Sequence, residues 1–508
     1  MDRLLAHAAY AAPALPGGTA ALRLSELMGA LSHALDITEG QPKGHCIRAC
    51  WIGMQIGRVL GLPSQARWEL YYTLLLKDLG CSSNAARICE LYLTDDLSFK
   101  RDFKLVGESL PQMLRFVFTH TGLSAGLRER LGAVMNIMRN GPAIAQELIQ
   151  TRCQRGADIA DHRALGAAHR RRQPASGRRC GGARRGVPAA SSEQQSADIA
   201  RQLRFPIGVA DGIRSLDEHW NGRGKPQGLA REAIPLYARI ALLAQVVDVF
   251  QVSAGPQAAL DEARARAGQG FDPALVAALE QAARQPGFWQ ALASPTLDRD
   301  VLDLEPGQHR VPLDEDYLDD IAAAFGQVVD AKSPYTSGHS TRVADISDRI
   351  AARLGLPAAR RRWLRRAALL HDLGKLGVSN AVLDKPGSLD DTEWAAVRQH
   401  AELTGTILSR IGAFDDLARV AAAHHERLDG RGYPLGLGAD AIALETRIIT
   451  TADIFDAISA DRPYRAAVPV PQTLAMMAKT VGSAIDPLCY EALSQAVGDG
   501  LPAAHDTH

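Results

Sequence analysis

Apolar residues recur at three- and four-residue spacing along most of the chain, which is the period of helices with one buried face. One such stripe consists of Val343, Ile346, Ile350 and Leu354. The same period recurs in residues 315–329, 359–372, 391–411, 415–427 and 446–459. The two-residue alternation expected of half-buried strands is hard to find anywhere in the sequence. The pattern predicts an all-α fold.

Two parts of the chain resemble each other in the same order. GHCIRACWIGMQIGRVLGLP at residues 44–63 aligns with GHSTRVADISDRIAARLGLP at residues 338–357, and LLLKDLGC at 74–81 aligns with ALLHDLGK at 368–375. Three further pairs follow, among them DEHWNGRGKPQGL and HERLDGRGYPLGL. Because chance rarely produces several matches in one order, we predict two tandem copies of a single helical unit.

The spacing between matched residues falls from 294 to 208 along the chain, so the first copy carries an insertion between residues 80 and 217. Part of it, residues 161–196, is rich in Arg, Ala, Gly and Ser and shows no helical period. An arginine-rich segment can bind nucleic acid, but no aromatic side chains interleave these arginines, and a disordered loop is the preferred interpretation. The predicted organisation is a degenerate helical domain, a linker, a second helical domain and a tail, at residues 1–295, 296–312, 313–500 and 501–508.

Composition and charge narrow the classes of function. Lys plus Arg number 57 and Asp plus Glu number 57, so no net charge attracts the chain to nucleic acid or to anionic lipid. The seven cysteines form no C-x-x-C pair, which is typical of reduced thiols in a cytoplasmic protein. The sequence contains no run of 18 apolar residues, and we therefore expect no membrane-spanning segment.

Candidate metal ligands gather in the second copy, on helices that are otherwise apolar. They are His339, His371, Asp372, His400, His424, His425 and Asp453. A single histidine on a helix is usually structural, but seven nitrogen and carboxylate ligands, two pairs of them adjacent, predict a helical bundle that holds metal. A ligand set without cysteine suits iron or manganese, and also zinc, nickel or cobalt.

Seven ligands exceed the three or four that one catalytic ion needs, so we expect two ions that share a carboxylate. Two neighbouring ions can activate a bridging hydroxide and stabilise an in-line displacement at phosphorus, which predicts phosphoester hydrolysis. Lys375 lies four residues after His371, and there it would place a cation beside the metals. Such a cation can neutralise charge that develops on a phosphoryl oxygen.

Three motifs strongly resemble the HD-GYP family, namely HDLGK at residues 371–375, HHERLDGRGYP at 424–434 and ADIFDAISADRPYR at 452–465. The resemblance covers residues 313–500 and implies a bacterial, metal-dependent phosphodiesterase that linearises cyclic di-GMP to pGpG, with some members continuing to GMP. Two alternatives are an HD-family phosphohydrolase acting on another nucleotide and a cyclic di-GMP-binding scaffold without turnover. The GYP and ADRPYR stretches argue against the first, and the complete ligand set argues against the second.

The resemblance also implies roles for single residues. One ion would be held by His339, His371, Asp372 and Asp453, and the other by His400, His424 and His425, with Asp372 bridging. Positions that contact substrate phosphate in the family are matched by Lys375, Arg462 and Arg465, although surface salt bridges are a competing interpretation for the two arginines. The loop that flanks the guanine site, and that can contact partner proteins, is matched by Gly432, Tyr433 and Pro434. Tyr335 replaces the carboxylate that binds a third ion in some relatives, so we expect two ions.

The first copy keeps few of these residues. Of the seven ligands it retains counterparts of two, His45 and Asp78, and it shows no clear counterpart of His400. The counterparts of His371, His424, His425, Asp453 and Tyr433 are Lys77, Leu216, Asp217, Gln245 and Lys225. Two ligand types cannot make a binuclear site, so we predict that the first copy carries out no metal-dependent hydrolysis. A structural or homodimerising half is the preferred interpretation, and a ligand-sensing half is the alternative.

Overall fold

The computed structural model describes residues 22–106, 110–122, 125–160, 203–307, 313–461 and 465–499. Within these ranges every regular element is a helix, and isolated bridges join Ala267 to Phe271, Asp429 to Gly438 and Val481 to Ile485. The predicted all-α fold is confirmed. The loop predicted at 161–196, the tail at 501–508 and Arg462 lie outside the described residues.

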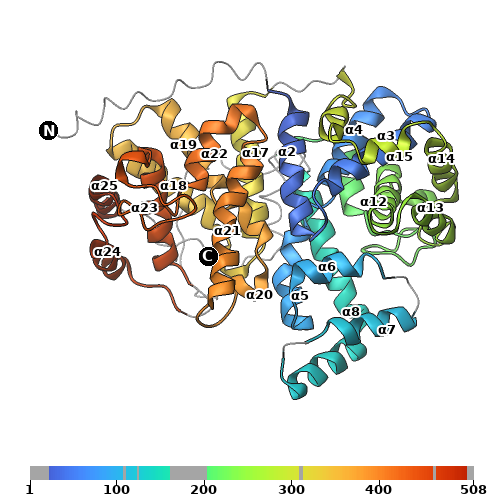
Figure 1. Ribbon diagram of the computed structural model, residues 1–508, viewed down its shortest axis with the longest axis horizontal. Coiled ribbons are helices and arrows are strands. Elements are labelled where there is room, and N and C mark those ends of the chain that lie inside the picture. Colours follow the sequence, from blue (N-terminus) through green and yellow to red (C-terminus); the bar gives the residue numbers. More distant parts are fainter. Residues whose placement is uncertain are drawn as a thin grey trace, which may run out of the picture.

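The helices form two halves that lie side by side, the first on the right and the second on the left of Figure 1. The α-helices of the first half are α2 (Leu24–Thr38), α3 (His45–Val59), α4 (Ser64–Leu76), α5 (Ala85–Tyr92), α6 (Asp96–Phe103), α7 (Leu110–His120), α8 (Leu127–Ala160), α11 (Ile207–Arg214), α12 (Leu236–Ala254), α13 (Pro256–Ala265), α14 (Pro273–Ala283), α15 (Phe288–Leu292) and α16 (Leu297–Leu302). Those of the second half are α17 (Glu315–Asp330), α18 (His339–Arg353), α19 (Ala358–Leu370), α20 (Asn380–Leu383), α21 (Asp391–Leu408), α22 (Asp415–Ala422), α23 (Leu444–Ser459), α24 (Val470–Ala478) and α25 (Pro487–Gly498). Short 3₁₀ turns are η3 (Cys81–Asn84), η5 (Arg231–Ala233), η7 (Pro334–Thr336), η8 (Leu373–Gly377), η9 (Gly412–Phe414) and η10 (Ala439–Ala441).

Equivalent helices in the two halves start in the same way. Helices α3 and α18 each follow a glycine in the left-handed region, Gly44 with φ of 85° and Gly338 with φ of 68°. Helices α14 and α25 each begin with proline after an aspartate, Asp272 or Asp486, whose side chain accepts hydrogen bonds from the first turn. The matched start signals show why the sequence repeat becomes a structural repeat of one helical unit.

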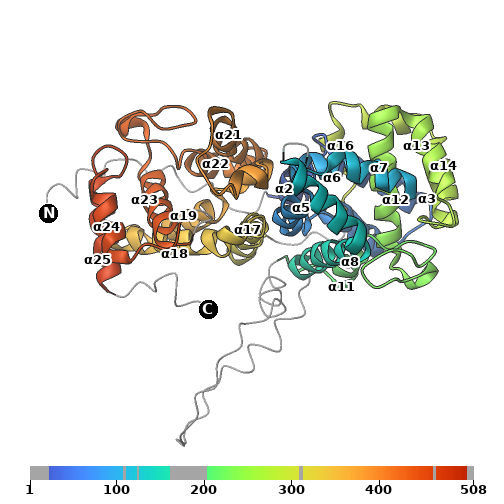
Figure 2. The same ribbon diagram turned by 90° about the horizontal axis from the view of Figure 1, so that it is seen from below.

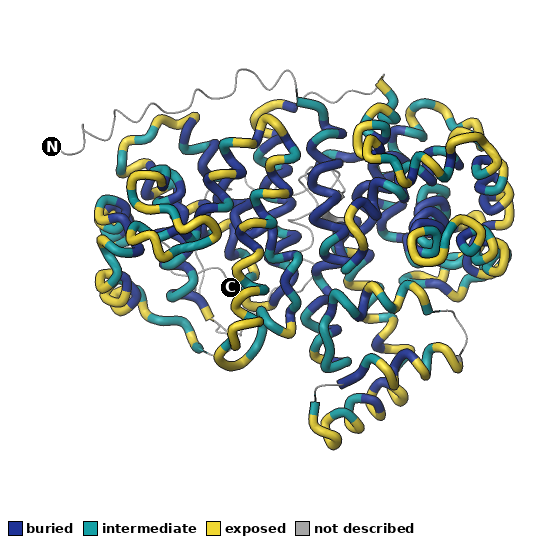
Figure 3. The backbone as a smooth tube through the Cα atoms, in the orientation of Figure 1, coloured by how far each residue is buried: buried dark blue, intermediate teal, exposed yellow. Residues whose placement is uncertain are grey.

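The two halves pack closely against each other. Helix α2 lies at the junction in both Figure 1 and Figure 2, where it packs against η8 and α21 of the second half. Buried apolar side chains from both halves form one continuous core. Buried residues of both halves, dark blue in Figure 3, meet in the middle of the molecule. Asp96 of the first half accepts a hydrogen bond from the Asn380 amide at 2.9 Å and pairs with Lys332 at 3.3 Å, and all three residues are buried. The halves therefore share a core rather than meeting at a flexible joint.

The segment between the halves is partly helical. The residues predicted as a linker include α16, whose Leu297 and Val301 are buried and which packs against α2 and α3. The chain thus stays attached to the first half through residue 302 before it enters the second. The exact division of the chain into domains stays a prediction.

One helix among the described residues, α12, is long and apolar enough to cross a membrane, judged by length and composition alone. More than half of its most apolar window, 56%, is buried inside the molecule. Its apolar side chains pack against α3, α4 and α13. A core helix of a globular protein meets the same criteria, and α12 occupies in the first half the place that α23 has in the second.

Candidate metal centre

Three of the predicted ligands are oriented by hydrogen bonds to the preceding helical turn. The Nδ1 atoms of His371, His400 and His424 lie 2.7, 2.5 and 2.7 Å from the carbonyl oxygens three residues earlier. A carbonyl oxygen only accepts, so Nδ1 carries the proton and Nε2 presents a lone pair. This is the tautomer in which a histidine binds metal through Nε2.

His339, at the start of α18, is oriented by a carboxylate instead. Its Nδ1 lies 2.7 Å from Asp456 Oδ2, and Arg342 Nε donates to Asp456 Oδ1 at 2.6 Å. Asp456 therefore does not face the other ligands but turns the Nε2 of His339 toward them. The residue was not among the predicted site residues, and its spacing three positions after Asp453 on α23 is the signal that points to it.

The Asp372 carboxylate lies between two groups of imidazoles. Its Oδ2 is 3.3 Å from His339 Nε2 and 3.2 Å from His371 Nε2. Its Oδ1 is 3.5 Å from His400 Nε2 and 3.6 Å from His424 Nε2. Each oxygen of one carboxylate faces a different pair of histidines, which is the arrangement required of a ligand shared by two cations.

The remaining predicted ligands complete the two groups. Three sets of ligand atoms lie within 4.8 Å of one another, namely His339 with His371 and Asp453, His371 with Asp372 and His424, and His400 with His424 and His425. The structure thus brings all seven predicted ligands together. Among the described residues, His339 Nε2, His371 Nε2 and Asp372 Oδ1 are buried and have no hydrogen-bond partner. Because an unsatisfied buried polar atom costs about 1–3 kcal/mol, these atoms fit bound cations as their partners.

Burial and neighbouring charges act differently on the ligands. Burial opposes protonation of His339, but the carboxylates of Asp372, Asp453 and Asp456 hold the pKa of its imidazole well above the usual value. Burial lowers the pKa of His400 to about 4 and that of His425 to about 3, so both imidazoles are neutral at pH 7. Burial opposes ionisation of Asp372, but His371 and Lys375 hold the pKa of its carboxyl well below the ordinary value. The Lys375 ammonium lies 2.5 Å from Asp372 Oδ2. The centre therefore combines an ionised carboxylate at Asp372 with neutral imidazoles at His400 and His425.

The loop at 426–437 folds over the second group of ligands. Glu426 accepts hydrogen bonds of 2.6, 3.1 and 2.8 Å from the backbone amides of residues 435–437 and so closes the loop. The Tyr433 ring centre lies 4.7 Å from that of His425. A Cβ at Gly432 would come within 2.6 Å of the His425 carbonyl oxygen, so this close approach requires glycine.

The predicted phosphate-contacting residues lie in different surroundings. Lys375 stands in the 3₁₀ turn η8 rather than on a continued helix, yet it reaches Asp372 as expected. Arg465 donates hydrogen bonds of 2.8 and 2.7 Å to the carbonyl oxygens of Ala457 and Ile458, near the end of α23. These bonds satisfy carbonyl groups that the helix end leaves without intrahelical partners.

Residues 190–275 and 324–488 match the HD domain family HD_5, so the match reaches both halves. The 3′3′-cGAMP-specific phosphodiesterase 3 of Vibrio cholerae serotype O1 is 53% identical over 474 residues, which cover 93% of this chain and 94% of that protein. The chain belongs to the HD-GYP family. A crystal structure of a V. cholerae cyclic GMP-AMP-specific phosphodiesterase covers 95% of this HD-GYP chain and 99% of its own, with a TM-score of 0.60 and 48% identity. The cyclic di-GMP phosphodiesterase response regulator RpfG of Xanthomonas campestris pv. campestris is 36% identical over 176 residues, which cover 33% of this chain and 45% of that protein.

Membership of the HD-GYP family confirms the resemblance seen in the three motifs. It also establishes the protein as an enzyme, a metal-dependent phosphohydrolase. The clustered imidazoles and carboxylates of the second half, with their unpartnered buried atoms, fit the divalent metal that HD domains bind.

The first half of this HD-GYP protein repeats the hydrogen bonds that orient the first histidine of the centre. His45 Nδ1 lies 2.7 Å from Asp248 Oδ2, and Arg48 Nε donates to Asp248 Oδ1 at 2.6 Å. The same three residue types make the same contacts around His339 in the second half. The scaffold that orients the first histidine is therefore intact in both halves.

Lys77 occupies the position that His371 has in the second half. Its ammonium forms an ion pair with Asp78, and both side chains are fully buried. Burial disfavours the ammonium, but Asp78 and the Cys46 thiol together hold the pKa of Lys77 above its usual value. A fixed positive charge therefore lies against the carboxylate that corresponds to Asp372.

Arg152 of α8 occupies the position of His400, for which sequence alignment of the two halves shows no clear counterpart. A Cβ at Gly80 would overlap the carbonyl oxygen of Arg152, just as a Cβ at Gly374 would overlap that of His400. The Arg152 guanidinium pairs with Asp217, which aligns with another second-half ligand. Part of the predicted insertion is thus α8, which serves in the first half as the equivalent of α21.

These cations change the chemistry of the first-half centre. Ligand atoms of Glu39, Asp78 and Cys81 lie within 4.8 Å of one another, a spacing that could hold a metal ion. Lys104 lies 2.8 Å from Glu39, and Lys77 pairs with Asp78, so both carboxylates already have side-chain cations. Lysine and arginine thus place positive charge where the second half has its predicted metal ligands.

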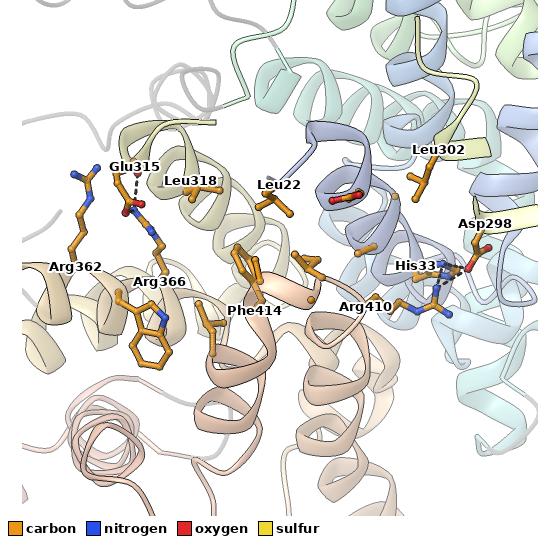
Figure 4. Close-up of a pocket in the computed structure, with 18 of the residues that line it drawn as sticks. Leu22, His33, Asp298, Leu302, Glu315, Leu318, Arg362, Arg366, Arg410 and Phe414 are labelled. Carbon is orange, nitrogen blue, oxygen red and sulfur yellow. Dashed lines mark hydrogen bonds and ion pairs between the residues drawn. The ribbon is translucent and has the colours of Figure 1, made fainter. Parts of the chain in front are cut away.

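Two cavities differ in their relation to the metal ligands. A small one of about 90 Å³ is lined by His339, Asp372, Lys375 and Tyr335, among others, and leads to the first group of ligands. A much larger one of about 1050 Å³ lies between the halves (Figure 4). None of the seven ligands lines the large cavity, and charged groups in it pair with one another, as Arg410 does with Asp298 at 2.9 Å. Of these two cavities, only the small one borders predicted metal ligands.

Replacing Asp456 with asparagine is expected to lower the metal affinity of the second half about 10- to 100-fold, because it removes the carboxylate that orients His339. The matched variant Asp248→Asn removes the same contact from His45 and should leave metal affinity unchanged. Metal content after equilibration with a graded series of chelator concentrations measures both. Equal losses in the two variants would contradict the placement of metal in the second half alone.

Proposed function

We propose that this HD-GYP protein hydrolyses a phosphodiester bond of a 3′3′-linked cyclic dinucleotide at two metal ions held by its second half. The observation that carries the proposal is the Asp372 carboxylate, whose two oxygens face separate pairs of imidazole Nε2 atoms. A carboxylate oriented in this way can bridge two cations. Two neighbouring cations can in turn stabilise the attacking and leaving oxygens of an in-line displacement at phosphorus.

Each ion would have its own group of ligands. The first ion is assigned to His339, His371 and Asp453, the second to His400, His424 and His425, and Asp372 to both. Two divalent cations bound there would lower the pKa of a coordinated water and offset negative charge at the phosphoryl group. Iron or manganese is the first choice for this nitrogen and carboxylate set, and zinc, nickel and cobalt are the others.

The preferred substrate is proposed from the relatives. A relative aligned over 94% of its own length is named as specific for 3′3′-cGAMP, whereas relatives named for cyclic di-GMP, such as RpfG, align over about a third of this chain. We therefore place 3′3′-cGAMP first and cyclic di-GMP, the substrate expected from the sequence motifs, second. The product in each case is a linear dinucleotide, pGpG from cyclic di-GMP, and further cleavage would give GMP.

Incubating the full chain with manganese or ferrous iron and each cyclic dinucleotide tests the proposal. Ion-exchange chromatography is expected to show a linear dinucleotide as the first product, formed faster from 3′3′-cGAMP than from cyclic di-GMP. Turnover of other nucleotides only would favour a different HD-family hydrolase. Tight binding of both cyclic dinucleotides without any product would favour a scaffold.

The first half is proposed to be a metal-free partner that packs against the catalytic half. The Lys77–Asp78 and Arg152–Asp217 ion pairs support this assignment, because they occupy the positions of metal ligands. The six cysteines among the described residues are free thiols, which supports a cytoplasmic location. Homodimerisation and a protein partner at the Gly432–Tyr433 loop stay predictions.

Lys375→Met is expected to lower kcat for the cyclic dinucleotide about 10- to 1000-fold, because the lost ammonium lies beside the bridging carboxylate where phosphoryl charge develops. Steady-state kinetics of the metal-loaded protein give kcat and KM separately. The control Lys479→Met removes an exposed lysine near the end of α24. A normal kcat in Lys375→Met, with the same metal content, would refute this role.

A further inference from the structure

Three side chains form a stack that leads from the surface to the second group of ligands. The guanidinium carbon of Arg398 lies 6.0 Å from the Trp394 ring centre and 5.7 Å from the Tyr433 ring centre. The Tyr433 ring in turn lies 4.7 Å from the His425 ring. Trp394 and Arg398 are four residues apart on α21, so they share one face of that helix.

Stabilisation of the fold does not explain why Trp394 and Arg398 are exposed at these positions. The Trp394 side chain is 45% exposed, although burying so large an apolar ring would stabilise the fold. Arg398 is exposed, and within the described part of the chain it has no ion-pair partner. By contrast, Arg360, Arg361 and Arg366 of the same half each pair with a carboxylate. An arginine left unpaired between two aromatic rings, beside a catalytic centre, is available to substrate.

We propose that Arg398, held between Trp394 and Tyr433, reads a guanine base of the substrate. A base is separated from its phosphate by the sugar, so its site must lie beside the metal centre rather than within it. A guanidinium presents two parallel N–H donors that match the O6 and N7 acceptors of guanine, whereas adenine has an amino donor in place of O6. The inference rests on the proposed function, since it requires a cyclic dinucleotide at the second half.

The aromatic side chains give this base site a stacking surface. An exposed indole stacks on any purine, so Trp394 contributes affinity while Arg398 contributes selectivity. Tyr335, 38% exposed, lines the small cavity beside the first group of ligands and offers a second ring, and no arginine is among the described residues that line this cavity. One base is therefore recognised as guanine by Arg398, and the other base only stacks on an aromatic ring. This predicts turnover of 3′3′-cGAMP and cyclic di-GMP and poor turnover of cyclic di-AMP.

The test compares Arg398→Met and Trp394→Leu with the wild-type full chain, all loaded with manganese. For each protein kcat/KM is measured with the three cyclic dinucleotides and with bis(p-nitrophenyl) phosphate, a diester that has no purine. Arg398→Met should lower the ratio of guanine-containing substrates to cyclic di-AMP about tenfold or more, mainly through KM. Trp394→Leu should lower kcat/KM for all three cyclic dinucleotides relative to the purine-free diester by about tenfold.

The control is Arg349→Met, which makes the same change at an exposed arginine of α18, ten residues from His339. An unchanged guanine preference in Arg398→Met would overturn the inference while leaving the proposed function in place. Equal losses on the purine-free diester would also overturn it, since they would show a structural effect. If the wild type hydrolyses bis(p-nitrophenyl) phosphate but none of the cyclic dinucleotides, the proposed function fails, and the base site fails with it.

Discussion

Replacing Asp372 with alanine is expected to lower kcat/KM for the cyclic dinucleotide by more than about a hundredfold, because loss of a residue that only supports a ligand already costs about 10- to 100-fold. Asp372 contacts both groups of imidazoles, and its Oδ1 has no hydrogen-bond partner among the described residues. The variant leaves neither ion with a complete ligand set. Initial rates with excess manganese measure the effect.

The matched control for this variant is Asp345→Asn, which changes a carboxylate of α18 that pairs with Arg365 at the surface. Far-ultraviolet circular dichroism establishes that Asp372→Ala retains its helices. A folded Asp372→Ala protein with more than a tenth of wild-type kcat/KM would show that this carboxylate does not bridge the ions.

Replacing Lys77 with methionine is expected to destabilise the protein by about 3–5 kcal/mol, the usual cost of leaving one partner of a buried ion pair unpaired. Lys77 and Asp78 are fully buried, and the thiols of Cys46 and Cys81 lie 3.6 Å from the Asp78 oxygens. Burial raises the pKa of the Asp78 carboxyl, but Lys77 and Lys104 together bring it below its ordinary value, so the ionised carboxylate depends on these ammonium groups. Chemical denaturation of the metal-loaded protein measures the change.

The double variant Lys77→Met/Asp78→Asn removes both charges and should recover much of the lost stability, since a buried pair can be replaced by neutral side chains at little cost. Metal content should be the same in wild type, single variant and double variant. Unchanged stability of Lys77→Met, or loss of metal from it, would contradict the role of Lys77 as a substitute for a cation.

The sequence was sufficient to predict which side chains gather in the second half. Adjacent pairs such as His371–Asp372 and His424–His425 cannot be explained as core residues, and the structure brings them together. The orientation of these histidine side chains was harder to predict from the sequence. The helices predicted to reach residues 372 and 427 end at Leu370 and Ala422, and these earlier ends turn the histidines toward one another. Helix ends without a strong stop signal are poorly marked in sequence.

Arg152 shows why the centre of the first half was harder to predict. The backbone of α8 packs against Gly80 in the same way as the backbone of α21 packs against Gly374. Such close packing requires a glycine on one side but does not restrict which side chain the helix carries on the other. The spacing to the equivalent residue also changes twice across the insertion, so no motif carries the match. Alignment of the two halves shows that Lys77 replaces the histidine, but only the structure shows that Lys77 forms an ion pair with Asp78.

The most direct test of two metal ions in the second half and none in the first is an anomalous-scattering map from crystals of the full chain grown with manganese. The account predicts two peaks on either side of the Asp372 carboxylate, one within reach of His339 and Asp453 and the other within reach of His400 and His425. It predicts no peak beside Asp78. A single peak at Asp372, or a peak among Glu39, Asp78 and Cys81, would contradict it.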